Sequence, residues 1–141
     1  MSHELTFLPE PGVLRQVRED VRQAAAKLGA EERVCDTAAL VVDELVNNAI
    51  EHGVAYRRHG HELEVRVLPA SSGIELVFHD PEMPAQEVTD LAAALAVAND
   101  MPSLENERGR GLFLMSIYLS GLKVEADSRG GMSLRGVIEN A

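Results

Sequence analysis

The chain has 141 residues, which is enough for one domain with a hydrophobic core. Its formal net charge is -10, from 13 basic and 23 acidic residues. This charge argues against nucleic-acid binding, which depends on neutralising phosphates with Lys and Arg. The sequence shows no signal peptide, no apolar run that could span a bilayer, and one cysteine, Cys35, without a partner for an internal disulfide. We therefore expect one domain, residues 1–141, in the cytoplasm, bound to neither membrane nor nucleic acid.

Apolar periodicity predicts short strands and amphipathic helices. In chain order these are an edge strand at 4–8, helices at 14–28 and 31–53, a hairpin at 62–68 and 74–80, helices at 86–98 and 112–119, and a final hairpin at 122–126 and 132–138. Residues 54–60 and 99–108 lack an apolar period and are predicted to be loops, the second of them mobile. This order predicts an α+β fold, a two-layer sandwich in which helices cover one face of a mostly antiparallel sheet.

The second half of the predicted helix at 31–53 carries a polar pair beside an apolar stripe. The stripe consists of Val42, Leu45, Val46, Ala49 and Ile50. Glu44 and Asn48 are neighbours on the adjoining face, because residues four apart lie one turn apart on a helix. A carboxylate can accept a proton or orient a nucleophile, and a carboxamide oxygen is a ligand that Mg²⁺ accepts. The polar face of an amphipathic helix is more often simply solvated, so this pair does not establish a site by itself. Gly53 is expected to end the helix.

A glycine-rich motif lies much later in the chain, at 107–115, where the residues are Glu-Arg-Gly-Arg-Gly-Leu-Phe-Leu-Met. Gly109 and Gly111 stand directly before the apolar pattern of the predicted helix at 112–119. Backbone N–H groups at a helix N-terminus favour an anion. The motif therefore predicts a phosphate-binding segment, and its position after the Glu44–Asn48 pair strengthens both predictions.

Together the two motifs resemble those of the Bergerat-type ATPases, the superfamily of gyrase, the heat-shock chaperone, histidine kinases and the mismatch-repair ATPase. The segment from Glu44 to Gly53, Glu-Leu-x-x-Asn-Ala-x-x-His-Gly, is similar to the N-box of that family. Gly109-Arg-Gly-Leu-Phe-Leu is similar to its second glycine box. The small size of the chain makes the anti-sigma-factor serine kinases the subgroup that it resembles, over nearly its whole length. The resemblance implies the Bergerat ATP-binding fold, with ATP and Mg²⁺ as cofactors.

The resemblance also implies roles for individual residues. Glu44 would be the catalytic residue that orients the attacking hydroxyl of a protein substrate, and Asn48 would be the metal ligand. One of the two arginines in the glycine box would neutralise charge on the transferred phosphoryl group. The nucleotide-binding residues would be Asn48, Asp80, Arg108, Gly109, Arg110 and Gly111.

The partners follow from the same resemblance. The chain would be an ATP-dependent protein serine/threonine kinase that phosphorylates a STAS-type anti-sigma antagonist. It would also be an anti-sigma factor, which holds a sigma factor away from RNA polymerase. Members of the family often form homodimers, so a homodimer is a further expectation.

Two departures from the family pattern fall at the adenine end. There the family has Asp-x-Gly-x-Gly, whose Asp accepts a hydrogen bond from the adenine amine. This chain has Asp80-Pro-Glu-Met-Pro, in which Glu82 and Pro84 replace the glycines. On the last strand Met132 replaces a Thr, and Ser133 is expected to face away from the site. A second hypothesis therefore stays open: a nucleotide-impaired module of the same fold that captures partners without kinase activity.

Overall fold

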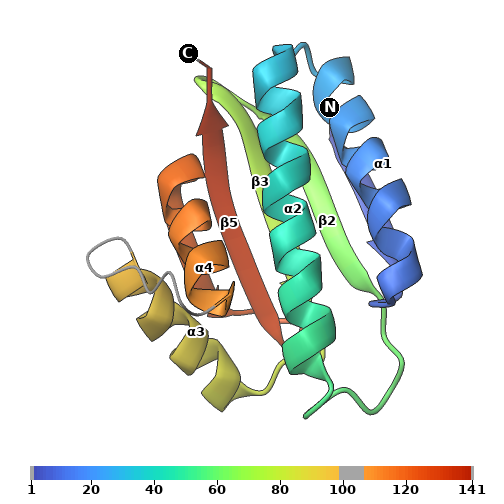
Figure 1. The fold of residues 1–141 in the computed structure, drawn as a ribbon, viewed down its shortest axis with the longest axis vertical. Helices are drawn as coiled ribbons and strands as arrows, with labels where there is room; N and C mark the ends of the chain where they lie inside the picture. The colour runs from blue at the N-terminus through green and yellow to red at the C-terminus, as the bar shows by residue number, and fades with distance from the viewer. Residues whose placement is uncertain (1, 99–106, 141) are drawn as a thin grey trace.

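The computed structural model of the protein describes residues 2–98 and 107–140. It confirms the predicted order of strands and helices and adds one short 3-10 turn (Figure 1). The strands are β1 His3–Phe7, β2 Leu63–Ala70, β3 Gly73–Asp80, β4 Ser120–Ala126 and β5 Met132–Glu139. The helices are α1 Leu14–Lys27, α2 Glu32–Gly53, α3 Ala85–Ala98 and α4 Glu107–Tyr118, and the 3-10 turn is η1 Pro11–Val13.

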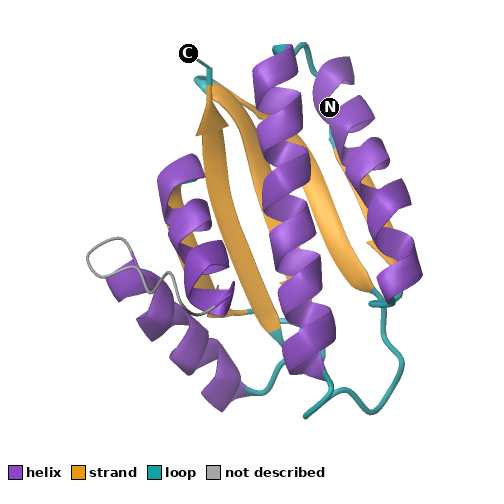
Figure 2. Ribbon diagram, viewed as in Figure 1, coloured by secondary structure: helices purple, strands orange, loops and turns teal. Residues whose placement is uncertain are grey.

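The strands form one five-stranded sheet in the order β1-β2-β3-β5-β4, and each neighbouring pair is antiparallel. β1 is an edge strand, as the sequence predicts. The helices lie on one face of the sheet, so the molecule has two layers (Figure 2). In β2, Leu63, Val65 and Val67 are buried, while Glu64 and Arg66 between them are only half-buried. The predicted two-layer α+β sandwich is confirmed.

α2 lies in the middle of the helical layer, with α1 on one side and α4 on the other (Figure 1). Its predicted apolar stripe is buried from Val42 to Ala49, whereas Ile50 is half-buried. Cys35 of the same helix is buried as a small apolar residue. Because the stripe fixes the rotation of α2 on the sheet, it also fixes the face that carries Glu44 and Asn48. No helix in the described part of the chain is long and apolar enough to cross a membrane.

α4 begins earlier than the sequence predicts. Residues 99–106 of the predicted loop lie outside the described residues, but 107 and 108 belong to α4 rather than to a loop. Glycine in a helix interior costs about 1 kcal/mol relative to alanine, which is why the pattern placed the helix start after Gly111. Buried Leu112 and Met115 attach the helix to the core. Packing therefore extends the helix through residues that disfavour it locally.

Candidate nucleotide-binding site

Two sequence motifs far apart in the chain meet where α4 contacts α2. Glu44 and Asn48 lie one turn apart on α2, and both are half-buried. Gly111 of α4 lies so close to them that a Cβ at this position would be 2.7 Å from Glu44 Oε2 and 3.9 Å from Asn48 Nδ2. A side chain on residue 111 would have to displace the Glu44 carboxylate. We call Glu44, Asn48 and Gly111 the N-box end of the site.

The side chain of Asn48 is oriented by its own helix. Its Nδ2 donates to the backbone carbonyl of Glu44 at 3.1 Å, which leaves its amide oxygen for a ligand. No group of three or more His, Cys, Asp or Glu residues that could hold a metal ion occurs in the part of the chain that the structure describes. A Mg²⁺ ion at Asn48 would therefore depend on oxygens of a bound ligand, which is the usual arrangement for Mg²⁺ with nucleotides.

The glycine box lies in the first turns of α4. Because α4 begins at Glu107, the backbone N–H of Gly109 is among the first-turn groups that have no acceptor within the helix. Gly111 is two residues further along and one turn after Glu107, where the N–H normally bonds within the helix. The close approach to Glu44 gives a separate reason for glycine at position 111. The roles predicted for Arg108, Gly109, Arg110 and Gly111 in phosphate binding stay predictions.

Asp80, at the end of β3, is fully buried and strongly bonded. Its Oδ1 accepts from Arg57 Nη1 at 3.1 Å and from the backbone N–H of Glu82 at 3.1 Å. Its Oδ2 accepts from Arg57 Nη2 at 2.8 Å and from the Tyr56 hydroxyl at 2.9 Å. Burial, and then the nearby Asp80 charge, raise the pKa of Tyr56, so its hydroxyl stays protonated as a donor. We call Tyr56, Arg57, Asp80 and Glu82 the Asp80 end of the site.

Gly53 ends α2 as expected, and it has a second structural role. α2 does end at Gly53, but this glycine is not among those with a positive φ. A Cβ there would lie 2.6 Å from Arg57 Nη2, and the same nitrogen donates to the carbonyl of Ala49 at 3.3 Å. Gly53 therefore makes room for the guanidinium group beside Asp80. From sequence alone, Tyr56 and Arg57 are predicted only to belong to a polar loop. The signal that could have found them is that a buried carboxylate such as Asp80 needs a partner.

Glu82, which replaces the first glycine of the family pattern, anchors the segment after α2. Its carboxylate accepts the backbone N–H groups of Arg58 at 3.0 Å, His59 at 2.7 Å and His61 at 3.2 Å, and lies 3.6 Å from Arg57 Nη1. Burial acts to raise the pKa of Glu82, but these three amides and the Arg57 charge outweigh it and lower the pKa. The substitution of glycine therefore creates a structural contact.

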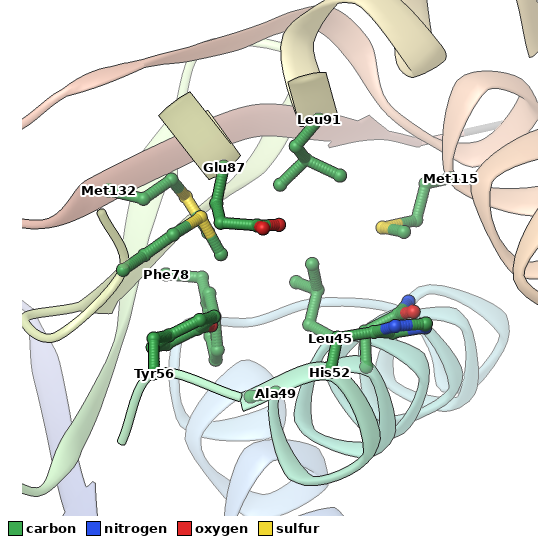
Figure 3. A pocket seen from close by; sticks show the side chains of 11 residues that line it. Leu45, Ala49, His52, Tyr56, Phe78, Glu87, Leu91, Met115 and Met132 are labelled. Carbon is green, nitrogen blue, oxygen red and sulfur yellow. The ribbon is translucent and has the colours of Figure 1, made fainter. Parts of the chain in front are cut away.

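A small cavity separates the two ends (Figure 3). Its volume is about 20 Å³, which is room for one water molecule. A larger ligand would have to move side chains, and methionine, with its flexible unbranched chain, adapts readily. Ser133 pairs with His79 in the sheet, while Met132 lines the cavity, so Ser133 faces away as predicted. The lining residues are Leu45, Asn48, Ala49, His52, Tyr56, Phe78, Met83, Glu87, Leu91, Met115 and Met132.

The sequence and fold place this chain among known ATPases. Residues 7–136 match the histidine kinase-like ATPase domain, and the chain belongs to this family. A chain in the crystal structure of the SiaB-SiaC complex from Pseudomonas aeruginosa has a similar fold, with a TM-score of 0.74 and 17% sequence identity. The match covers 96% of this chain and 88% of that chain. No curated protein matches the sequence. The family predicted from the two motifs is confirmed, and membership of an ATPase family implies a nucleotide ligand.

Proposed function

We propose that this protein is an ATP-dependent protein serine/threonine kinase that acts in partner switching. Its substrate would be a STAS-type anti-sigma antagonist, and its other partner would be a sigma factor that it holds inactive. The observation that carries the proposal is the N-box end, where Gly111 lies directly against Glu44 and Asn48. A scaffold that only captures proteins has no physical need for a carboxylate and a carboxamide beneath a glycine.

Residues of the N-box end and of the glycine box would each have a separate role in phosphoryl transfer. Bound Mg·ATP would supply the phosphoryl group. Asn48 would hold Mg²⁺ through its amide oxygen. The first-turn N–H of Gly109 would hold phosphate oxygens, and the N–H of Gly111 would join it once its hydrogen bond within the helix opens. Arg108 or Arg110 would neutralise the charge that develops on the phosphate, because this chemistry depends on positioning and electrostatics.

Glu44 is the residue that we assign to the protein substrate. Its carboxylate would orient the attacking serine or threonine hydroxyl and accept its proton. Gly111 presents no side chain to Glu44, and a Cβ there would be 2.7 Å from Glu44 Oε2. The similarity to a chain from a two-protein complex supports an interaction partner for this fold, and a homodimer belongs to the same proposal.

The test compares Glu44→Gln with Glu51→Gln, an exposed glutamate on the same helix. Three quantities are measured for each: phosphate transfer to the antagonist, binding of Mg·ATP, and binding of the sigma factor. Glu44→Gln should lower the transfer rate by about 10²- to 10⁴-fold and leave both affinities nearly unchanged. Glu51→Gln should transfer phosphate at the unaltered rate. Equal rates for the two variants would rule Glu44 out.

The second candidate is a partner-binding module without kinase activity. Two observations favour it: the donors around Asp80 come from the protein itself, and the cavity holds about 20 Å³. Under this reading the unaltered protein captures its antagonist but binds no nucleotide and transfers no phosphate. Capture without transfer, at saturating Mg·ATP, would therefore select the module over the kinase.

A further inference from the structure

The hydrogen-bonding positions of Asp80 are all in use. An ionised carboxylate has about four lone-pair positions. In Asp80 each oxygen accepts two hydrogen bonds, from Arg57 and Glu82 on one side and from Arg57 and Tyr56 on the other. An adenine amine would need one of these positions. Freeing one means separating the buried ion pair with Arg57, which is strongly unfavourable, or displacing the Tyr56 hydroxyl or the Glu82 amide, which would each then need a new acceptor.

A second carboxylate lies where the base of a nucleotide would need a partner. Glu87 of α3 lines the cavity, and Figure 3 shows its carboxylate directed into the space between Tyr56, Leu91 and Met115. Burial and Asp80 are the main causes of the raised pKa of Tyr56, and the Glu87 charge makes a small further contribution. In a mostly apolar cavity, a few polar groups determine how a ligand is oriented.

We propose that Glu87, and not Asp80, is the carboxylate that contacts the base of the bound nucleotide. This inference rests on the proposed function, since it takes the cavity as the place of the base. A carboxylate accepts a hydrogen bond from the amine of adenine, and it equally accepts from N1–H and the 2-amino group of guanine. The site is therefore one for purine nucleoside triphosphates of both kinds, with the methionine side chains moving aside for the base.

The test measures affinities of the full chain by calorimetry for three probes: Mg·ATP, Mg·GTP and Mg·tripolyphosphate, which has no base. The variant is Glu87→Gln. Its control is Asp90→Asn on the same helix, an exposed acid bonded to Gln86 at 2.9 Å. For the unaltered chain, ATP and GTP should bind within about tenfold of each other. Glu87→Gln should weaken both by about 10- to 100-fold, the loss of one charge-assisted hydrogen bond, and leave tripolyphosphate unchanged.

The outcomes separate this inference from the kinase proposal. If ATP binds at least about 100-fold more tightly than GTP and Glu87→Gln behaves like Asp90→Asn, the inference is wrong and the kinase proposal stands. If Glu87→Gln also loses tripolyphosphate, the residue acts on the fold and the inference is wrong. If none of the three probes binds, both proposals fail. Parallel loss of ATP and GTP with tripolyphosphate retained supports the inference.

Discussion

At the N-box end, the side chain of Asn48 is oriented by helix backbone. Asn48 bonds to its own helix, and Gly111 keeps a side chain away from Glu44. At the Asp80 end, the polar groups are paired with one another. Asp80 is surrounded by Tyr56, Arg57 and the Glu82 amide. The first end holds the groups that we propose for ligand binding, whereas the second is a buried network of hydrogen bonds within the protein.

The difference between the two ends follows from the burial of Asp80. A fully buried carboxylate must be paired, whether by a ligand or by the protein. Where the family pattern has glycines, this chain has Glu82, whose carboxylate holds the segment 58–61. That segment directly follows Arg57, so the change at Glu82 and the pairing of Asp80 belong to one arrangement. We expect variants at the two ends to differ in kind, with stability affected at one and ligand affinity at the other.

The largest expected effect is on stability, from Arg57→Met. The change removes both guanidinium bonds to Asp80 and leaves its carboxylate buried without a cation. We expect the free energy of unfolding to fall by about 3–5 kcal/mol, measured by urea denaturation. Arg58→Met is the control, because Arg58 is exposed and its side chain donates to backbone carbonyls such as that of Ala55 at 3.0 Å. Equal losses for the two variants would mean that the Asp80 network contributes little.

The next prediction concerns the N-box end, where Asn48→Ala should leave stability nearly unchanged. Affinity for Mg·ATP should fall by about 10- to 100-fold, as for other losses of a metal-site contact, and affinity for ATP without Mg²⁺ should change little. Asn47→Ala is a close control, since Asn47 also bonds one turn back, to Asp43 at 3.3 Å. If the Mg²⁺-dependent part of the affinity survives in Asn48→Ala, this residue is not a metal ligand.

Periodicity was sufficient to predict the layers of the fold and the stripe of α2, because burial of one face is a local property of the pattern. It failed at α4, where contacts of Leu112 and Met115 outweigh the low helix propensity of the glycines. Such packing contacts are not visible in a local window of sequence. A motif predicts which residues are candidates to bind a ligand. It does not predict whether side chains of a neighbouring loop occupy their hydrogen-bonding positions instead.

That limit applies to the Asp80 end. The sequence pattern identifies Asp80 as a candidate residue and shows that the family glycines are absent. It predicts only a loop at Tyr56 and Arg57, because a long-range ion pair leaves no local signal in the sequence. Gly53 ends α2 as predicted, but the pattern does not show that its lack of a side chain also accommodates Arg57. The N-box end was easier to predict because Glu44 and Asn48 are neighbours on one helix.

A smaller effect is expected from Glu82→Gln, and it should depend on pH. The amide retains one acceptor oxygen, so the segment 58–61 should lose about 1.5 kcal/mol of local stability at neutral pH. The folded-state pKa of Glu82 is lowered, so its contribution is present above the unfolded pKa of about 4.3 and is lost as the pH falls through the folded value. Hydrogen exchange of the His59 and His61 amides measures it. The difference in amide protection between the unaltered protein and Glu82→Gln should decrease as the pH falls. A difference that does not change with pH would contradict a stabilising role of the ionised Glu82 carboxylate.

The smallest effect is expected from Tyr56→Phe, which removes one of the four hydrogen bonds to Asp80 and keeps the ion pair. At about pH 8 the variant should be less stable by about 1 kcal/mol. Burial raises the pKa of Tyr56, so the folded state favours the neutral hydroxyl. The stabilisation is complete below the unfolded pKa of about 10 and is lost as the pH rises towards the higher folded value. The unaltered protein should therefore lose stability above about pH 10 more steeply than Tyr56→Phe, and the gap between them should narrow. A stability difference that stays constant as the pH rises would show that burial beside Asp80 does not keep the Tyr56 hydroxyl neutral.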